Sequence, residues 1–233
     1  MDSGVPLFLD RFHEPGLVAP IARSFSSAKW YDRLIRLKCG VMKLLRIQDA
    51  ELALVGFDQP ESVLDIGCGP NLDLPNAERL NRRMKCYTGI DVSAPFAVAA
   101  RLRHPEDHYY FAQASAMDLP FPDDEFEVCI LSFVCHHVEG DLGLVLAEAS
   151  RVSRSAVVIY DHVVSDGRWM SKVQLLYWRL FDGGTQYLKW GEWESLLRGY
   201  QVVSVLRTGA LGRHVVKMVY RAANGNSVYA ADH

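Results

Sequence analysis

The sequence lacks the features that mark several large classes of protein. Its 233 residues contain no CxxC pair, and their five cysteines are scattered, so neither a disulfide scaffold nor a cysteine-rich metal site is expected. No window of about 18 uninterrupted apolar residues occurs, which argues against a membrane-spanning helix. The formal net charge is only −3, with acids and bases interspersed, and this disfavours a dedicated nucleic-acid-binding protein. The N-terminal residues also lack a basic and apolar leader, so we expect a cytoplasmic protein.

Two nucleotide-binding motifs are absent as well. There is no GxxxxGK[ST], which argues against a nucleoside triphosphate as ligand. Leu72 stands at the third glycine position of GxGxxG, so the dinucleotide fingerprint of nicotinamide enzymes fails. The stretch 63–71 nevertheless has the order of a buried strand that enters a tight turn at Gly67 and Gly69. We therefore expect a ligand that carries an adenosine but needs no pyrophosphate cradle.

Alternating apolar runs and helical patterns indicate an α/β fold. The expected strands span 62–66, 86–91, 109–113, 127–133 and 156–161, and the expected helices span 71–83, 94–103 and 142–152. This alternation predicts a Rossmann-like, mostly parallel sheet with helices on both faces. We expect a single domain with four parts, namely an N-terminal arm and helix (1–55), a cofactor-binding core (62–161), an acceptor lid (162–198) and a terminal β pair (199–221). The lid is expected to contain helices at 168–181 and 190–197, and the β pair is expected to consist of runs at 200–207 and 214–221.

Acids follow the expected strands where a ligand would bind. Asp91 lies 22 residues past Gly69, at the place where a carboxylate would accept both hydroxyls of a ribose. After the third strand, Met117 could pack on a base and Asp118 could accept its exocyclic amine. Asp65 would face a ligand ammonium, directly or through water. S-adenosylmethionine supplies all these groups.

In these motifs the chain resembles the class I S-adenosylmethionine-dependent methyltransferases. The resemblance rests on residues 64–69 (Leu-Asp-Ile-Gly-Cys-Gly), 89–93 (Gly-Ile-Asp-Val-Ser), 117–121 (Met-Asp-Leu-Pro-Phe) and the run from 126 into His136 and His137. It implies a seven-stranded sheet with an antiparallel last strand. Asn71 departs from the pattern, because many members have a third glycine there. The cofactor-binding residues that the resemblance implies are Asp65, Gly67, Cys68, Gly69, Asp91, Val92, Met117, Asp118, Ser132, Phe133 and Tyr31.

Histidines supply the candidate general bases for methyl transfer, because their pKa lies near working pH. His136 and His137 follow the fourth strand, His162 follows the fifth, and His214 lies near the last β run. Hydrogen-bonded structural roles are the alternative for each of them. Their spacing places no two ligands on one helix face, so no metal is expected. The fourth strand is followed neither by an Asn/Asp-Pro-Pro run nor by a Pro-Cys pair, which favours a small-molecule acceptor.

Aromatic residues gather after the fifth strand. In the resembled family this region and the N-terminal helix, here with Trp30 and Tyr31, form a lid over the acceptor, which suits an apolar or aromatic metabolite. The lid aromatics are Trp169, Tyr177, Trp178, Phe181, Tyr187 and Trp190. Two other interpretations stay open for them, namely ordinary core packing and an amphipathic membrane-surface helix at 168–181.

Other functions and assemblies also stay open at this stage. The chain could bind the cofactor without transferring a methyl group, as a regulatory or partner subunit or in another reaction, or it could be a nucleotide-linked oxidoreductase. A homodimer through the arm at 1–25 is a further alternative.

Overall fold

The computed structural model describes residues 60–71, 84–181, 184–210 and 213–221. The predicted N-terminal arm and helix, including Trp30 and Tyr31, lie outside these residues. So does all but the first residue of the helix predicted at 71–83.

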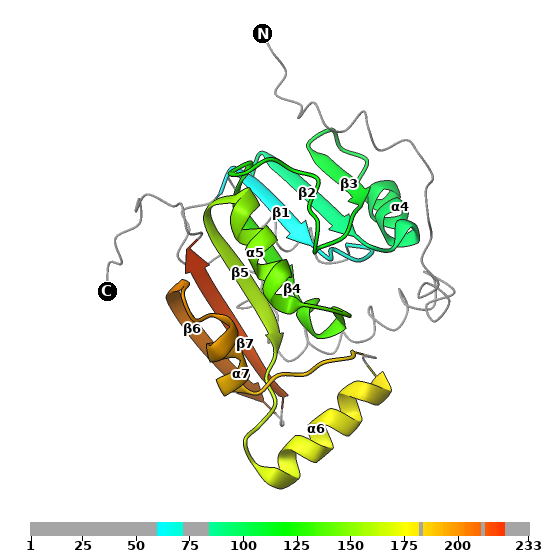
Figure 1. Cartoon of the computed structure of the whole chain (residues 1–233). Helices are drawn as coiled ribbons and strands as arrows, with labels where there is room; N and C mark the ends of the chain where they lie inside the picture. Colours follow the sequence, from blue (N-terminus) through cyan, green and yellow to red (C-terminus); the bar gives the residue numbers. More distant parts are fainter. Residues whose placement is uncertain (1–59, 72–83, 182–183, 211–212, 222–233) are drawn as a thin grey trace.

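A mixed sheet with strand order β3-β2-β1-β4-β5-β7-β6 forms the centre of the fold (Figure 1). Its parallel part comprises β1 (Ser62–Ile66), β2 (Cys86–Asp91), β3 (Tyr109–Gln113), β4 (Phe126–Ser132) and β5 (Ser153–His162). β7 (Arg213–Arg221) pairs antiparallel with both β5 and β6 (Gln201–Ala210). The five parallel strands confirm the predicted α/β, Rossmann-like class.

Four helices and one short 3₁₀ helix lie between the strands in the part of the chain that the structure describes. They are α4 (Ala94–Arg103), η3 (Cys135–His137), α5 (Leu142–Val152), α6 (Arg168–Phe181) and α7 (Trp190–Leu196). β5 begins at Ser153, three residues before the strand predicted at 156–161, because α5 ends at Val152 and enters the strand with no turn residues between them. A register shift between Phe126 and Val128 accommodates this early start opposite β4.

The side chains of each strand divide between two buried layers. On one face, Leu64 and Ile66 of β1 pack with residues of α5 and with Trp193 of α7. On the other face, Val63 packs with Tyr87 and with neighbours from β3, β4 and β5. Fully burying one such side chain is worth about 1.5–3 kcal/mol, so the alternation along each strand fixes its register.

The strand order places a topological switch point between β1 and β4. From β1 the chain moves through β2 to β3 on one side, and it then returns to start the other side at β4. Ligands of open α/β sheets bind at the carboxyl ends of the strands beside such a point. The polar side chains singled out from the sequence lie at this edge.

Candidate functional site at the carboxyl edge of the sheet

The turn after β1 is shaped by two glycines. Gly67 and Gly69 have φ angles of +75° and +56°, in the left-handed region that favours glycine. The backbone N–H groups of Gly67 and Cys68 both donate to the carbonyl of Ile90, at 2.8 and 2.9 Å. A Cβ at Gly67 would lie 2.2 Å from Cγ2 of Val134, so close packing beyond β4 also requires glycine there. Within the described part of the chain, no heavy atom outside residues 68–70 lies within 4 Å of a Cβ built on Gly69, so a ligand could approach the turn at this residue.

Asp91 joins this turn to the end of β2. Its Oδ2 accepts the N–H of Gly69 at 2.9 Å, and its Oδ1 accepts the N–H of Ser93 at 2.8 Å. Burial raises the pKa of Asp91, and the two backbone hydrogen bonds offset part of that rise. Each carboxylate oxygen can accept a further hydrogen bond, so the group remains suited to a vicinal diol. Val92, the next residue, leaves an exposed apolar surface beside it.

A series of side-chain hydrogen bonds holds Asp65, which lies just before the turn. The Tyr87 hydroxyl donates to Oδ2 of Asp65, and the Asn71 amide donates to the Tyr87 hydroxyl. Burial, followed by the charge of Asp65, raises the pKa of Tyr87 well above its ordinary value, so the hydroxyl stays protonated and remains a donor. Nε2 of His104 donates to the Asn71 carbonyl at 2.8 Å and so connects this series of hydrogen bonds to the end of α4.

Asn71 takes the conformation that a third glycine would take. Its φ angle is +50°, and asparagine is among the few residues with a side chain that adopt this region readily. The departure from the family pattern therefore preserves the turn. Asn71 also adds a side-chain hydrogen bond that a glycine could not make.

The turn after β3 brings Met117 and Asp118 to the same edge. Ser115 organises this turn, because its carbonyl accepts the N–H of Asp118 at 3.3 Å and its hydroxyl accepts the N–H of Met117 at 3.2 Å. Asp118 is exposed, and Met117 is partly buried. A Cβ at Gly140 would lie 3.0 Å from Sδ of Met117, so this side chain reaches the loop before α5.

The end of β4 carries backbone strain. Phe133 has a φ angle of +54°, which is unfavourable for an aromatic residue, and its N–H donates to the Tyr160 carbonyl at 2.7 Å. Its ring centroid lies 5.2 Å from that of His162. Such strain persists only where the surroundings enforce it, and it is common at ligand sites. Phe133 thus lies beside His162, directly after Ser132, the last residue of β4.

A buried acid connects two of the candidate bases. Nδ1 of His136 lies 2.6 Å from Oδ1 of Asp161, and the backbone N–H groups of His136 and His162 also donate to this carboxylate, at 3.3 and 2.6 Å. Burial acts to raise the pKa of Asp161. The charges of His136 and His162 and the hydrogen bonds to them outweigh burial, so the pKa lies below its ordinary value. Asp161 is therefore an ionised acceptor in a buried site.

Four aromatic rings, two of them the histidines that contact this acid, stack on one another in series. His162 stacks on Trp178 at 4.5 Å between ring centroids, Trp178 stacks on Tyr187 at 5.1 Å, and Tyr187 stacks on His136 at 5.3 Å. The segment 184–187 is held over His136, because the N–H groups of Thr185 and Gln186 both donate to the His136 carbonyl. We name the set His136, Asp161, His162, Trp178 and Tyr187 the aromatic cluster.

The structure brings together most, but not all, of the predicted site residues. His136 and His162 share Asp161, while His137 packs beside His136 with 4.2 Å between ring centroids and remains partly exposed. Tyr31 and the side chain of His214 lie outside the description. The described residues contain no group of three or more His, Cys, Asp or Glu side chains that could hold a metal ion.

Sequence reasoning missed Tyr87, His104 and the shared role of Asp161. The signal for Asp161 was its place at the end of a predicted parallel strand. Tyr87 and His104 carry no signal in the sequence, because their burial and their hydrogen bonds are seen only in the folded structure.

Comparisons of the sequence with known proteins find methyltransferases. A protein-family profile described as "Methyltransferase domain" matches residues 64–160. The chain is 35% identical over 94 residues to a fatty-acid O-methyltransferase of Mycolicibacterium smegmatis, covering 40% of this chain and 33% of that protein. It is 27% identical over 150 residues to a demethylmenaquinone methyltransferase of Tropheryma whipplei, covering 64% and 61%. The chain thus spans about a third of the first relative and less than two thirds of the second.

Solved structures share the fold at low identity. A geranyl diphosphate methyltransferase in complex with S-adenosylmethionine superposes with a TM-score of 0.60 at 17% identity, covering 85% of this chain and 92% of that one. The [4+2]-cyclase SpnF superposes with a TM-score of 0.59 at 17% identity, covering 78% and 81%.

Proposed function

We propose that this chain, which belongs to the class I S-adenosylmethionine-dependent methyltransferases, transfers the cofactor's methyl group to an O, N or C nucleophile of a small apolar or aromatic acceptor. The observation that carries the proposal is the position of Asp91. Its carboxylate bonds the Gly69 N–H directly, so the acid after β2 and the glycine turn after β1 present one continuous surface.

In this proposal each part of the cofactor has a matching group. Asp91 accepts the ribose hydroxyls, and the adenine packs against Val92 and Met117 with its amine toward Asp118. The methionine portion crosses residues 67–69, near Ser132 and Phe133, with its ammonium toward Asp65. Tyr31 would contribute from the N-terminal helix.

The charges at the turn support a cationic ligand. Burial, and then the charges of Asp65 and Asp91, raise the pKa of Cys68 well above its ordinary value. Cys68 therefore stays a neutral thiol between two carboxylates. An ammonium and a sulfonium would be attracted to these carboxylates, whereas a phosphate would be repelled.

The acceptor is inferred from the surroundings of the aromatic cluster. We infer that segment 162–198, with α6 and α7, is an acceptor lid over the seven-stranded sheet. Two relatives support an apolar acceptor, since one is a fatty-acid and the other a demethylmenaquinone methyltransferase. A lid of stacked aromatic rings would also exclude water from the transfer step.

Among the candidate bases, the geometry favours His136. Its Nδ1 hydrogen donates to Asp161, so in the neutral ring the other nitrogen, Nε2, carries the lone pair that can take a proton. His162 has a positioning role in this view, because its backbone N–H helps to fix Asp161 and its ring stacks on Trp178. His137 is the next candidate.

A His136→Asn variant is expected to lower kcat by roughly a hundredfold, the lower end of the range for loss of a general base. The Kd for S-adenosylmethionine should change little, because Asp91 and the glycine turn are intact. Single-turnover kinetics and calorimetry would separate the two effects. His137→Asn is the matched control, and an equal loss of kcat in that variant alone would move the base to His137.

The test of the function itself is turnover. The full chain is incubated with S-adenosylmethionine and separate acceptors, namely a long-chain fatty acid, a demethylated quinol and a simple phenol. Mass spectrometry then follows both the methylated product and S-adenosylhomocysteine. Methylation of at least one apolar acceptor is expected.

A second function is favoured by one structural neighbour. SpnF is a [4+2]-cyclase with the same fold, so this fold also serves reactions other than methyl transfer. Cofactor binding with no methylated product from any acceptor would support that alternative for this chain.

A Tyr87→Phe variant is expected to weaken S-adenosylmethionine binding about tenfold, because the hydroxyl that orients Asp65 toward the ammonium is lost. Binding of 5′-methylthioadenosine, which lacks the amino-acid portion, should change much less. Calorimetry with both ligands measures the difference. Tyr110→Phe, on the neighbouring strand β3, is the control, and an equal loss for both ligands would show that Tyr87 has only a structural role.

A further inference from the structure

Helix α6 has its apolar face outward. Trp169 and Leu176 are 78% and 62% exposed, and Val173 and Met170 are exposed beside them. The inward face carries Trp178, 3% exposed, and the polar Gln174, which is also buried. A surface helix normally has the reverse arrangement.

Specific contacts fix this orientation. Oε1 of Gln174 accepts the N–H of Ser165 at 2.8 Å, and Trp178 stacks on His162. Trp169, Val173 and Leu176 follow one another at spacings of four and three residues, so they form a single stripe along the helix. We call Trp169, Met170, Val173 and Leu176 the α6 stripe.

The charge of α6 complements an anionic surface. Residues 168–181 contain three basic residues and no acid. Two of the basic residues, Arg168 and Lys172, are exposed on this helix. A tryptophan and aliphatic residues on one side, with basic residues at the edge, are typical of helices that lie in the plane of an anionic bilayer surface. None of the described helices has the length and hydropathy of a transmembrane segment.

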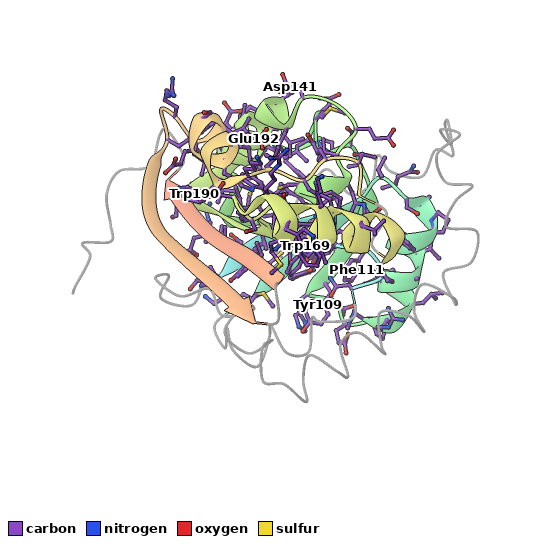
Figure 2. All side chains as sticks on the ribbon, turned by 90° about the horizontal axis from the view of Figure 1, so that it is seen from below. Tyr109, Phe111, Asp141, Trp169, Trp190 and Glu192 are labelled. Carbon is purple, nitrogen blue, oxygen red and sulfur yellow. The ribbon has the colours of Figure 1, made fainter. Side chains whose placement is uncertain are left out.

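The same helix contributes to the aromatic cluster. α6 lies beyond the carboxyl ends of the parallel strands (Figure 1), and the view from below shows it across that edge with Trp169 labelled (Figure 2). Its inward face touches His162, and its outward face is the stripe. An apolar acceptor that partitions into a bilayer would therefore meet the helix that bounds the site.

We propose that the α6 stripe docks on an anionic membrane surface, from which a lipophilic acceptor reaches the aromatic cluster. The docking stands on the exposure and charge of α6, whereas the acceptor route rests on the proposed function. The two parts are therefore tested by separate readouts.

Vesicle flotation of the full chain tests the docking. Vesicles of phosphatidylcholine with phosphatidylglycerol should carry the protein, and binding should weaken with added salt or with pure phosphatidylcholine. A Trp169→Glu/Leu176→Glu variant should partition at least about tenfold less. Leu102→Glu is the matched control, because Leu102 is also 78% exposed but lies on α4, and its partition should equal that of the wild type. Lys172→Glu should weaken binding to anionic vesicles only.

Titration of every variant with S-adenosylmethionine separates a loss of membrane docking from damage to the cofactor site. Unchanged S-adenosylmethionine binding by Trp169→Glu/Leu176→Glu shows that the site is intact and that the loss is one of docking. Three outcomes would overturn the docking proposal, and none of them bears on the proposed methyl transfer. They are wild-type protein that does not float with anionic vesicles, equal flotation of the stripe variant, and a wild-type dimer in light scattering that the stripe variant converts to monomer. The last outcome would assign the stripe to a second copy of the chain.

Discussion

An Asp91→Ala variant is expected to bind S-adenosylmethionine at least about a hundredfold more weakly than the wild type. In the proposed complex the ribose makes two hydrogen bonds to this carboxylate, and each hydrogen bond to a charged group is worth roughly 1.5–3 kcal/mol. Their sum of about 3–6 kcal/mol corresponds to a factor of more than a hundred in Kd. The variant also releases the Gly69 N–H, which loosens the turn itself.

The control for Asp91 must lose a similar backbone contact without touching the site. Asp141 is the N-cap of α5, and its Oδ1 accepts the N–H of Gly143 at 2.8 Å. Asp141→Ala should lower thermal stability slightly and leave the Kd unchanged. If both variants bind the cofactor equally well, Asp91 only holds the backbone at Gly69 and Ser93, and the proposed ribose contact is wrong.

An Asp161→Ala variant is expected to lose about 3–5 kcal/mol of unfolding free energy at neutral pH, because it leaves a buried histidine without its charged partner. The carboxylate accepts hydrogen bonds from the His136 ring and from two backbone N–H groups, all buried within the aromatic cluster. Urea unfolding measures the loss. Asp123→Ala is the control, because its carboxylate pairs with Arg151 at the surface and should contribute less than about 1 kcal/mol.

The pH dependence of this difference follows from the lowered pKa of Asp161. A carboxyl whose folded-state pKa lies below its unfolded value of about 3.9 stabilises the fold fully above that value. The stabilisation is lost as pH falls through the lower, folded-state pKa. The gap between wild type and Asp161→Ala should therefore be present at pH 7 and should shrink as the pH falls below about 4. A gap that is already absent at pH 7 would contradict an ionised Asp161.

Much of the core could be predicted from the sequence because its elements have clear local signals. β1, β2 and β3 have the bounds that their apolar runs predict, and α4, α5 and α6 have the bounds that their periodicity predicts. Asp91 was found from its spacing to Gly69, and the structure joins the two by a hydrogen bond. The early start of β5 could not be predicted, because no turn residue separates it from α5.

Contacts between side chains of different strands could not be predicted from local sequence patterns. Tyr87 reaches Asp65 from a neighbouring strand, and Asp161 reaches His136 across 25 residues. Which groups meet depends on strand order and on the turn that follows each strand, and neither is encoded in spacing alone. The outward apolar face of α6 was equally hidden, because periodicity identifies an amphipathic helix without saying which face is buried.

Calorimetric titration of the full chain with S-adenosylmethionine and S-adenosylhomocysteine tests the central claim most directly. We predict saturable binding of both at one site per chain, with adenosine alone binding more weakly because it cannot reach Asp65. Heat with neither ligand, under conditions where the protein is folded, would contradict the account of the turn at residues 67–71 and of Asp91.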